Sequence, residues 1–181
     1  KKYNIETRLT ATQDLILVNI NKEDVEGVSS LLKENNIDTN EKYSNLRLAS
    51  MACPALPTCS LAVAEAERFL PSLIDQLDLR GFGNEKIKIR MSGCPNSCSR
   101  PPVSEIGLIG ATANKYYSYL GGDFYGTRLN RLFLELVDDE ELADKISKLI
   151  NYWKENRKNQ NQAFGDFCNI EDFEVLRRVV V

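Results

Sequence analysis

Four of the five cysteines in this 181-residue chain fall into two close pairs. Five residues separate Cys53 from Cys59, and three separate Cys94 from Cys98. Both pairs lie in segments rich in proline, glycine and small residues, where sulfurs can point inward and backbone N–H groups are free to bond them. Ordinary buried cysteines would instead be scattered over helices and strands. The pairing therefore predicts four ligands to one metal group.

The spacing of the pairs favours one kind of metal group over another. Disulfides are not expected, because they are unlikely in a reducing compartment and nothing else in the chain indicates a secreted protein. Structural zinc sites with four cysteines usually space each pair by two to four residues, and the gap between Cys53 and Cys59 is longer. We therefore expect an iron–sulfur cluster, with a zinc-stabilised binding module as the alternative. Cys168 lies outside both pairs and is interpreted as a small buried residue.

The chain contains no histidine. This removes the usual general base, the usual haem ligand and the usual zinc partner. A Ser-His-Asp or Cys-His nucleophile is therefore excluded within this chain. Any metal bound here must be held by thiolates or carboxylates.

Composition and charge indicate a soluble, cytoplasmic protein. The hydrophobic fraction is 43% and the charged fraction 27%, as in globular proteins. No apolar run approaches the ~20 residues of a membrane helix, and the amino terminus is polar rather than like a signal peptide. A net charge of −3 argues against nucleic acid as a partner, since phosphate binding needs a basic surface. We expect neither membrane nor nucleic-acid binding.

The hydrophobic pattern predicts a strand–helix unit at the amino terminus. Residues 6–10 and 15–20 read as strands, and Asn21 is placed to cap a helix over residues 22–34. Such a small unit cannot bury its own apolar face well and should pack on something else. The helix face is formed by Val25, Val28, Leu31 and Leu32.

The middle of the chain predicts a connection and then a longer helix. Residues 37–50 are polar and read as a connection. A helix is expected after Cys59, capped by Ser60 and kinked or divided at Pro71. Its buried side would consist of Ala62, Ala66, Phe69, Leu70, Leu73, Ile74 and Leu77.

Alternation and helical spacing predict the remaining elements. Residues 87–91 alternate apolar and charged side chains, which indicates a strand. Strands are also expected at residues 105–109 and 116–120, and helices at residues 140–155 and 171–180. The fold class is therefore α+β.

The cysteine motifs resemble those of the sulfite and nitrite reductase family. Residues 51–59 (MACPALPTC) and 64–68 (AEAER) are similar to its first cluster motif, and residues 92–101 (SGCPNSCSRP) to its second. The family pattern is C-x5-C, a long gap, then C-x3-C, and all four cysteines are present. Further similar segments are residues 8–13 (RLTATQ), 120–122 (LGG) and 126–128 (GTR).

The resemblance implies two coupled cofactors. Cys53, Cys59, Cys94 and Cys98 would hold a 4Fe–4S cluster, and Cys98 would also bridge to the iron of a sirohaem. Sirohaem carries many carboxylates, so cationic and N–H donors should surround it. The candidate donors are Asn96, Arg100, Gln13 and Arg128.

The resemblance also implies a domain organisation. Residues 1–45 would be part of a ferredoxin-like half-domain that contacts sirohaem, and residues 46–181 the 4Fe–4S and sirohaem-binding domain. Family members are much longer and consist of two similar halves, of which this chain matches the later part. The residues that bind the anion and donate protons belong mainly to the earlier half. That amino-terminal half is an expected partner, and the chain alone should have no turnover.

The implied activity is the six-electron reduction of sulfite to sulfide by an assimilatory sulfite reductase. The surroundings of Cys53 and residues 164–167 (FGDF) favour sulfite over nitrite as the substrate. Residues 54–57 (PALP) favour a ferredoxin donor over the flavoprotein donor of an NADPH-type enzyme. The alternatives are a nitrite reductase of the same family and an iron–sulfur electron carrier without haem. Residues 10–13 and 120–122 argue against a carrier, which needs no macrocycle cradle.

Overall fold

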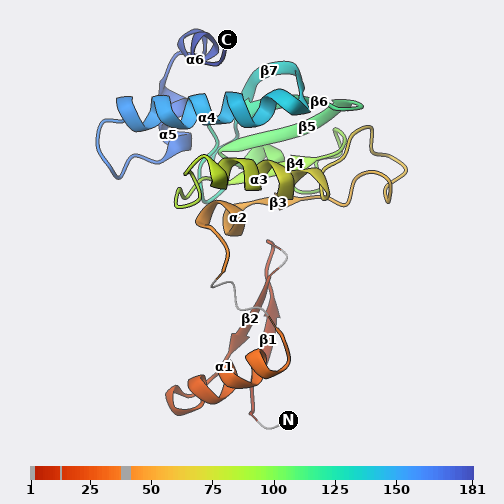
Figure 1. The fold of residues 1–181 in the computed structure, drawn as a ribbon, viewed down its shortest axis with the longest axis vertical. Helices are drawn as coiled ribbons and strands as arrows, with labels where there is room; N and C mark the ends of the chain where they lie inside the picture. The colour runs from red at the N-terminus through yellow and green to blue at the C-terminus, as the bar shows by residue number, and fades with distance from the viewer. Residues whose placement is uncertain (1–2, 13, 38–41) are drawn as a thin grey trace. The chain divides into compact units, whose positions relative to one another are not determined.

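The computed structural model describes residues 3–12, 14–37 and 42–181, which form two compact units (Figure 1). The first unit covers residues 1–43 and the second residues 44–181. Both contain helices and strands, so the predicted α+β class is confirmed. The assignment of residues 1–45 to a ferredoxin-like half-domain and of residues 46–181 to a cofactor-binding domain stays a prediction. No helix among the described residues has the length and apolar character needed to cross a membrane.

The first unit is a β-hairpin followed by a helix. Strands β1 (Glu6–Leu9) and β2 (Leu15–Val18) pair antiparallel, and the helical segments η1 (Lys22–Asp24) and α1 (Val25–Glu34) follow. These elements lie where the sequence predicts them. Within α1 only Val28 is buried, so the predicted apolar face is largely uncovered in this unit. A two-stranded hairpin is marginally stable unless it packs against other elements.

The second unit contains a five-stranded mixed sheet in the order β3-β4-β5-β6-β7. Strands β3, β4 and β5 run parallel, while β5, β6 and β7 pair antiparallel. Parallel neighbours end at the same edge of a sheet, which brings the segments after β3 and β4 together. The strands are β3 (Met51–Ala52), β4 (Ile89–Ser92), β5 (Ile106–Thr112), β6 (Lys115–Leu120) and β7 (Arg131–Asp138).

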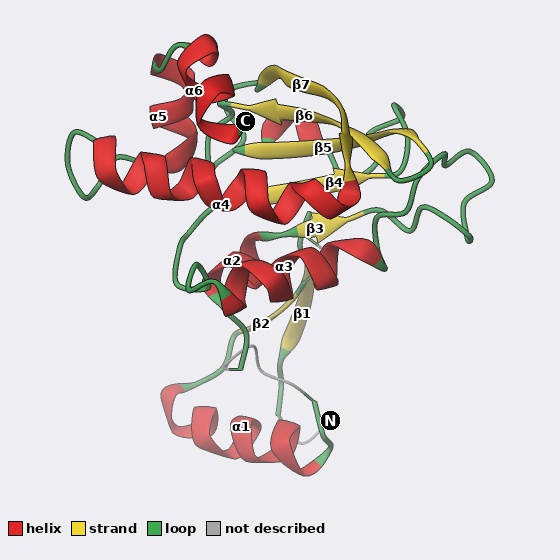
Figure 2. Cartoon of the chain, turned by 45° about the horizontal axis from the view of Figure 1, so that its top comes forward, coloured by secondary structure: helices red, strands yellow, loops and turns green. Residues whose placement is uncertain are grey.

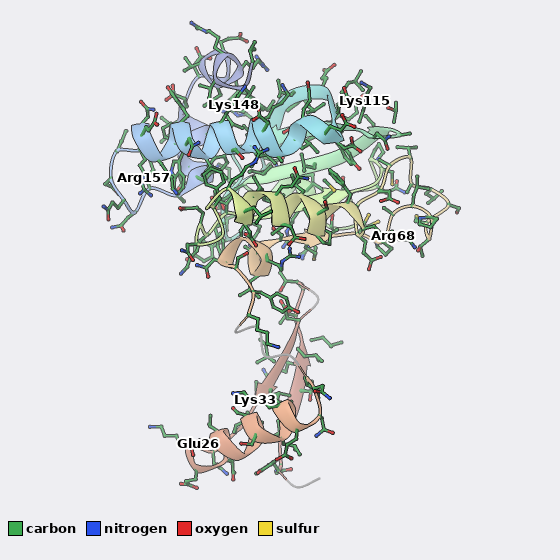
Figure 3. All side chains as sticks on the ribbon, viewed as in Figure 1. Glu26, Lys33, Arg68, Lys115, Lys148 and Arg157 are labelled. Carbon is green, nitrogen blue, oxygen red and sulfur yellow. The ribbon has the colours of Figure 1, made fainter. Side chains whose placement is uncertain are left out.

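Helices α3 (Phe69–Leu79) and α4 (Asp139–Asn156) lie along one face of this sheet (Figure 2). The core between them is aliphatic and aromatic, and it includes the face of α4 that the sequence predicts. Charged side chains such as Lys148 and Lys115 lie on the outside of this unit (Figure 3). Buried members of the core are Leu73, Leu77, Ile89, Met91, Ile106, Leu108, Leu142, Ile146 and Ile150.

The helix predicted after Cys59 is wrong in its first half. Residues 53–68 contain neither helix nor strand, and α3 begins at Phe69. Ser60 is exposed and caps nothing, and Pro71 lies in the first turn of α3, where proline is tolerated, rather than at a kink. The apolar residues before Phe69 pack in a loop instead.

Several elements were not predicted. The polar connection contains α2 (Asn45–Ala49), which Ser44 caps by accepting a hydrogen bond from the N–H of Arg47. The carboxyl end contains α5 (Phe164–Ile170) in addition to the predicted last helix, observed as α6 (Phe173–Val180). Strand β7 was missed because Leu136 has a positive φ and its register against β6 shifts, which breaks the alternation of side chains.

A buried carboxylate joins β4, β5 and α5. Glu105 is fully buried, and its two side-chain oxygens accept hydrogen bonds from the N–H groups of Lys88 (2.9 Å) and Gly165 (2.8 Å). Burial raises the pKa of Glu105 from 4.5 to about 7, although these two N–H groups oppose the rise. The charged form is therefore disfavoured in the folded state.

We predict that Glu105→Gln makes the stability of the fold less sensitive to pH. A carboxyl whose pKa is raised on folding stabilises the folded state below about pH 4.5, and that contribution is lost as the pH rises through about 7. The rise corresponds to roughly 3 kcal/mol at most. Urea unfolding at pH 5 and pH 8 should therefore show wild type losing roughly 2–3 kcal/mol relative to the variant.

The absence of histidine makes this test clean, because no imidazole titrates in that window. Glu67→Gln removes one negative charge from an exposed position and serves as the matched control. Parallel pH profiles for wild type and Glu105→Gln would contradict the prediction.

Candidate cofactor site

The first cysteine of each pair lies at the carboxyl edge of the parallel strands. Cys53 directly follows β3, and Cys94 follows β4 after one intervening residue. The N–H of Cys53 donates to the carbonyl of Met91 at 3.1 Å, and the N–H of Gly93 donates to the sulfur of Cys53 at 3.3 Å. The structure therefore brings the start of both cysteine loops together, although Cys53 and Gly93 are 40 positions apart in the sequence.

The loop that carries Cys59 folds back onto the same glycine. The carbonyl of Gly93 accepts hydrogen bonds from the N–H groups of Val63 (2.9 Å) and Ala64 (3.1 Å). Within the loop, the N–H of Cys59 donates to the carbonyl of Ala55 at 2.7 Å. Cys59 is half-buried, whereas Cys53 is buried. Gly93 is thus the backbone contact that joins the two cysteine loops.

Only glycine fits at this contact. A Cβ atom on Gly93 would lie 2.5 Å from the carbonyl oxygen of Ala64 and 2.6 Å from Cβ of Ala55. On the next strand, a Cβ on Gly110 would lie 2.5 Å from the carbonyl oxygen of Gly93. Distances this short are not observed for real side chains, so the two loops and β5 approach each other through backbone alone.

The second loop is closed by a pair of buried serines. The hydroxyl oxygens of Ser92 and Ser99 lie 2.7 Å apart, and the N–H of Ser99 donates to Ser92 Oγ at 3.2 Å. The hydroxyl of Ser99 also donates to the carbonyl of Met91 at 2.7 Å. These bonds hold the loop at both ends. Within it Cys94 is buried, while Cys98 is exposed.

Both loops contain non-glycine residues in the left-handed region. The φ angles are 49° at Ala55, 56° at Ser97 and 58° at Arg100. Each such conformation costs on the order of 1–3 kcal/mol, and such residues concentrate at ligand clamps and active sites. The two cysteine loops therefore have the backbone character of a binding site.

Two cations at β4 were not predicted as site residues: Arg90, which lies under the second loop, and Lys88, whose Nζ donates to the carbonyl of Phe124. Arg90 on β4 is 4% exposed, and its Nη1 donates to the carbonyl of Ser99 at 3.0 Å. Its Nε has no hydrogen-bond partner among the described residues. Burial, and then the charge of Arg100, lower the pKa of Arg90; burial, and then Arg90, lower that of Lys88. The sequence signal that could have indicated them is the alternation of Lys88 and Arg90 with apolar residues in a predicted strand.

The four residues predicted to contact sirohaem differ in exposure and in the partners that they bind. Asn96 and Arg100 are exposed in the second cysteine loop. Arg128 donates to the carbonyls of Gly121 (2.7 Å) and Gly122 (3.2 Å), and forms an ion pair with Asp166 at 2.7 Å. Gln13 lies outside the described residues. A cofactor role for each of these four residues stays a prediction.

The donor set fits an iron–sulfur cluster better than zinc. Zinc needs four ligands around one ion, and no three His, Cys, Asp or Glu side chains within the described ranges converge closely enough to hold one. In a 4Fe–4S cluster each thiolate binds a different iron, so the sulfurs stand around a larger body. All five cysteines are free thiols, and Cys168 is buried within α5, as its position outside the motifs predicts.

Comparison with known proteins matches the part of the chain that carries these loops. Residues 45–178 match the family described as "Nitrite and sulphite reductase 4Fe-4S domain". The sulfite reductase (NADPH) hemoprotein beta-component of Nitrobacter hamburgensis is 45% identical over 165 residues, which is 89% of this chain and 28% of that protein. The protein of the same name from Oceanobacillus iheyensis is 44% identical over 172 residues, or 92% of this chain and 30% of that protein.

Solved structures show the same fold. The Mycobacterium tuberculosis NirA protein aligns with a TM-score of 0.70 and 23% identity, covering 94% of this chain and 34% of that one. Dissimilatory sulfite reductase I also aligns with a TM-score of 0.70, at 13% identity, covering 97% of this chain and 61% of that one. This chain thus spans less than a third of the curated relatives named above. It belongs to the family of nitrite and sulphite reductase 4Fe-4S domains.

Proposed function

We propose that this chain is the cluster- and sirohaem-binding part of a sulfite reductase haemoprotein, which reduces sulfite to sulfide with six electrons. The observation that carries the proposal is the meeting of the two cysteine loops at Gly93, at the carboxyl edge of β3 and β4. The names of the relatives support sulfite as the substrate over nitrite. Nitrite reduction by the same family stays the second candidate.

The proposed cluster ligands are Cys53, Cys59, Cys94 and Cys98. Their burial supports different roles, because Cys53 and Cys94 are buried while Cys98 is exposed. A thiolate that bridges to a second cofactor must face outward from the cluster, so Cys98 is the proposed bridge to sirohaem. When bound, the two cofactors store and pass single electrons, which sulfite reduction requires six times.

The chain's own residues hold and shield this site. The N–H of Gly93 donates to the sulfur of Cys53, the type of bond that tunes a bound cluster. Asn96 and Arg100 are exposed beside Cys98 and are the first candidates to bind sirohaem carboxylates. Gln13 and Arg128 are the further candidates, although Arg128 already pairs with Asp166.

The proposed electron donor is a flavoprotein. Residues 54–57 favour the ferredoxin-dependent type, whereas the relatives at 44–45% identity are named as NADPH enzymes. Similarity over nearly nine-tenths of the chain carries more weight than four residues, so the NADPH-type enzyme is preferred. Sulfite binding and proton donation are assigned to the part of the enzyme beyond this chain.

Residues 1–45 are proposed to be part of a ferredoxin-like half-domain that contacts sirohaem. The exposed apolar side chains of the hairpin support a partner for this unit, because Leu9, Leu15 and Ile16 are all exposed. The amino-terminal half of the same enzyme is the proposed partner.

The cofactors predict a coloured, iron-containing holoenzyme. Its visible spectrum should show sirohaem bands, with about four or five irons per chain and no stoichiometric zinc by elemental analysis. Cys53→Ser should lose most of this iron because it removes a buried ligand. Cys168→Ser is the matched control and should retain it, since that thiol is buried in α5. Stoichiometric zinc without iron would refute the proposal.

The 181-residue chain alone should produce no sulfide with reduced methyl viologen as the donor. The physical reason is that the groups assigned to sulfite binding and proton transfer lie beyond it. Sulfide production should return when the amino-terminal half is added and a complex forms. Turnover by the chain alone would show that these groups lie within residues 1–181.

A further inference from the structure

Arg90 is a buried cation on the face of the sheet away from the main core. It alternates with Ile89 and Met91, which are fully buried members of that core. Its neighbour in register on β5 is Gly107, where a Cβ would lie 2.6 Å from the carbonyl oxygen of Pro101. The backbone after the second cysteine loop therefore covers this face closely, and Arg90 is enclosed there at 4% exposure.

The guanidinium group of Arg90 lies against the second cysteine loop. Its Nη1 donates at 3.0 Å to the carbonyl of Ser99, the residue that follows Cys98. Ser99 is itself held by hydrogen bonds to Ser92 and Met91. The positive charge is thus held next to the backbone that carries two of the proposed cluster ligands.

The charge of Arg90 is not balanced by the described part of the chain. No ion pair joins it to a carboxylate in that part, and its Nε is buried without a hydrogen-bond partner. The charges that act on it belong to cations: Arg100, whose charge lowers the pKa of Arg90, and Lys88, whose own pKa Arg90 lowers. A buried charge without a partner strongly destabilises a fold. An anionic group bound beside the loop would supply the missing balance.

We propose that Arg90 is a positioning residue for electron transfer, whose buried positive charge stabilises the reduced state of the cluster held by the two cysteine loops. The inference rests on the proposed function. With the cluster bound, one electron from the proposed flavoprotein donor would add one negative charge to it, without forming or breaking a bond to the protein. A nearby cation in a low-dielectric setting lowers the free energy of that added charge. Net charge and burial are among the factors that set cluster potentials.

Two roles of Arg90 can be separated by substitution. Arg90→Gln removes the charge, Arg90→Lys keeps it, and Ser99→Ala keeps it while removing the hydroxyl that closes the loop. If Arg90 acted only by holding the loop, Ser99→Ala would disturb the cluster as much as Arg90→Gln. If the charge of Arg90 is what matters, Arg90→Gln will change the cluster potential more than Ser99→Ala does.

The test is the midpoint potential of the cluster in the cofactor-loaded holoenzyme, followed by electron paramagnetic resonance during a redox titration. We expect Arg90→Gln to shift the equilibrium at least tenfold toward the oxidised cluster, or about 59 mV for one electron. Arg90→Lys and Ser99→Ala should each move it by less than half as much. An unchanged potential in Arg90→Gln, or an equal shift in Ser99→Ala, would overturn the proposal.

Loss of the cluster in a variant is also informative. If Arg90→Gln retains no iron, Arg90→Lys decides: a retained cluster with near wild-type potential supports a role for charge. Loss of the cluster in Arg90→Lys as well would show that the shape of arginine is required, and would contradict the inference. A wild-type enzyme without any cluster signal would instead refute the proposed function.

Discussion

The close approach of backbone at Gly93 is the constraint on which the site depends. Through its N–H and carbonyl, this residue binds the sulfur of Cys53 and the N–H groups of Val63 and Ala64. A Cβ here would collide with both Ala64 and Ala55. The first loop could then not lie on the second, and four thiols from two distant segments would not share one edge of the sheet. The parallel pairing of β3 and β4 brings the segments near, and the missing side chain lets them touch.

The polar groups under the second loop form a layer of their own. Ser92 and Ser99 satisfy one another and the backbone, whereas Arg90 keeps a buried donor without a partner among the described residues. A well-paired network adds rigidity, and an unpaired buried group is destabilising. Folds retain such groups at sites where a ligand completes them. Glu105 contrasts with Arg90. Two backbone N–H groups donate to its carboxyl oxygens, and its raised pKa means that much of the carboxyl group is protonated and neutral near pH 7.

Periodicity predicted most of the long, regular elements and failed at the short ones and at β7, where the positive φ of Leu136 breaks the alternation. Strands β4, β5 and β6 and helix α4 have clear alternation or helical spacing, and they were found. Strand β3 has two residues, α2 five and α5 seven, which is too few for a period to emerge. The helix predicted after Cys59 failed for a different reason. Its first half has helical spacing, but hydrogen bonds from that loop to Gly93, distant in sequence, replace a helix there.

The sequence by itself determined the candidate ligand set, because the spacing within each cysteine pair is local and is read directly from the chain. It also determined the α+β class and the family resemblance. Only the tertiary structure decided which groups surround those ligands. Arg90, Ser99 and Gly93 have their roles through contacts between β4, β5 and the two loops, and separation along the chain hides such contacts. It also decided that Cys98 faces outward while Cys53 and Cys94 are buried, because burial depends on what packs over a residue rather than on its neighbours in sequence.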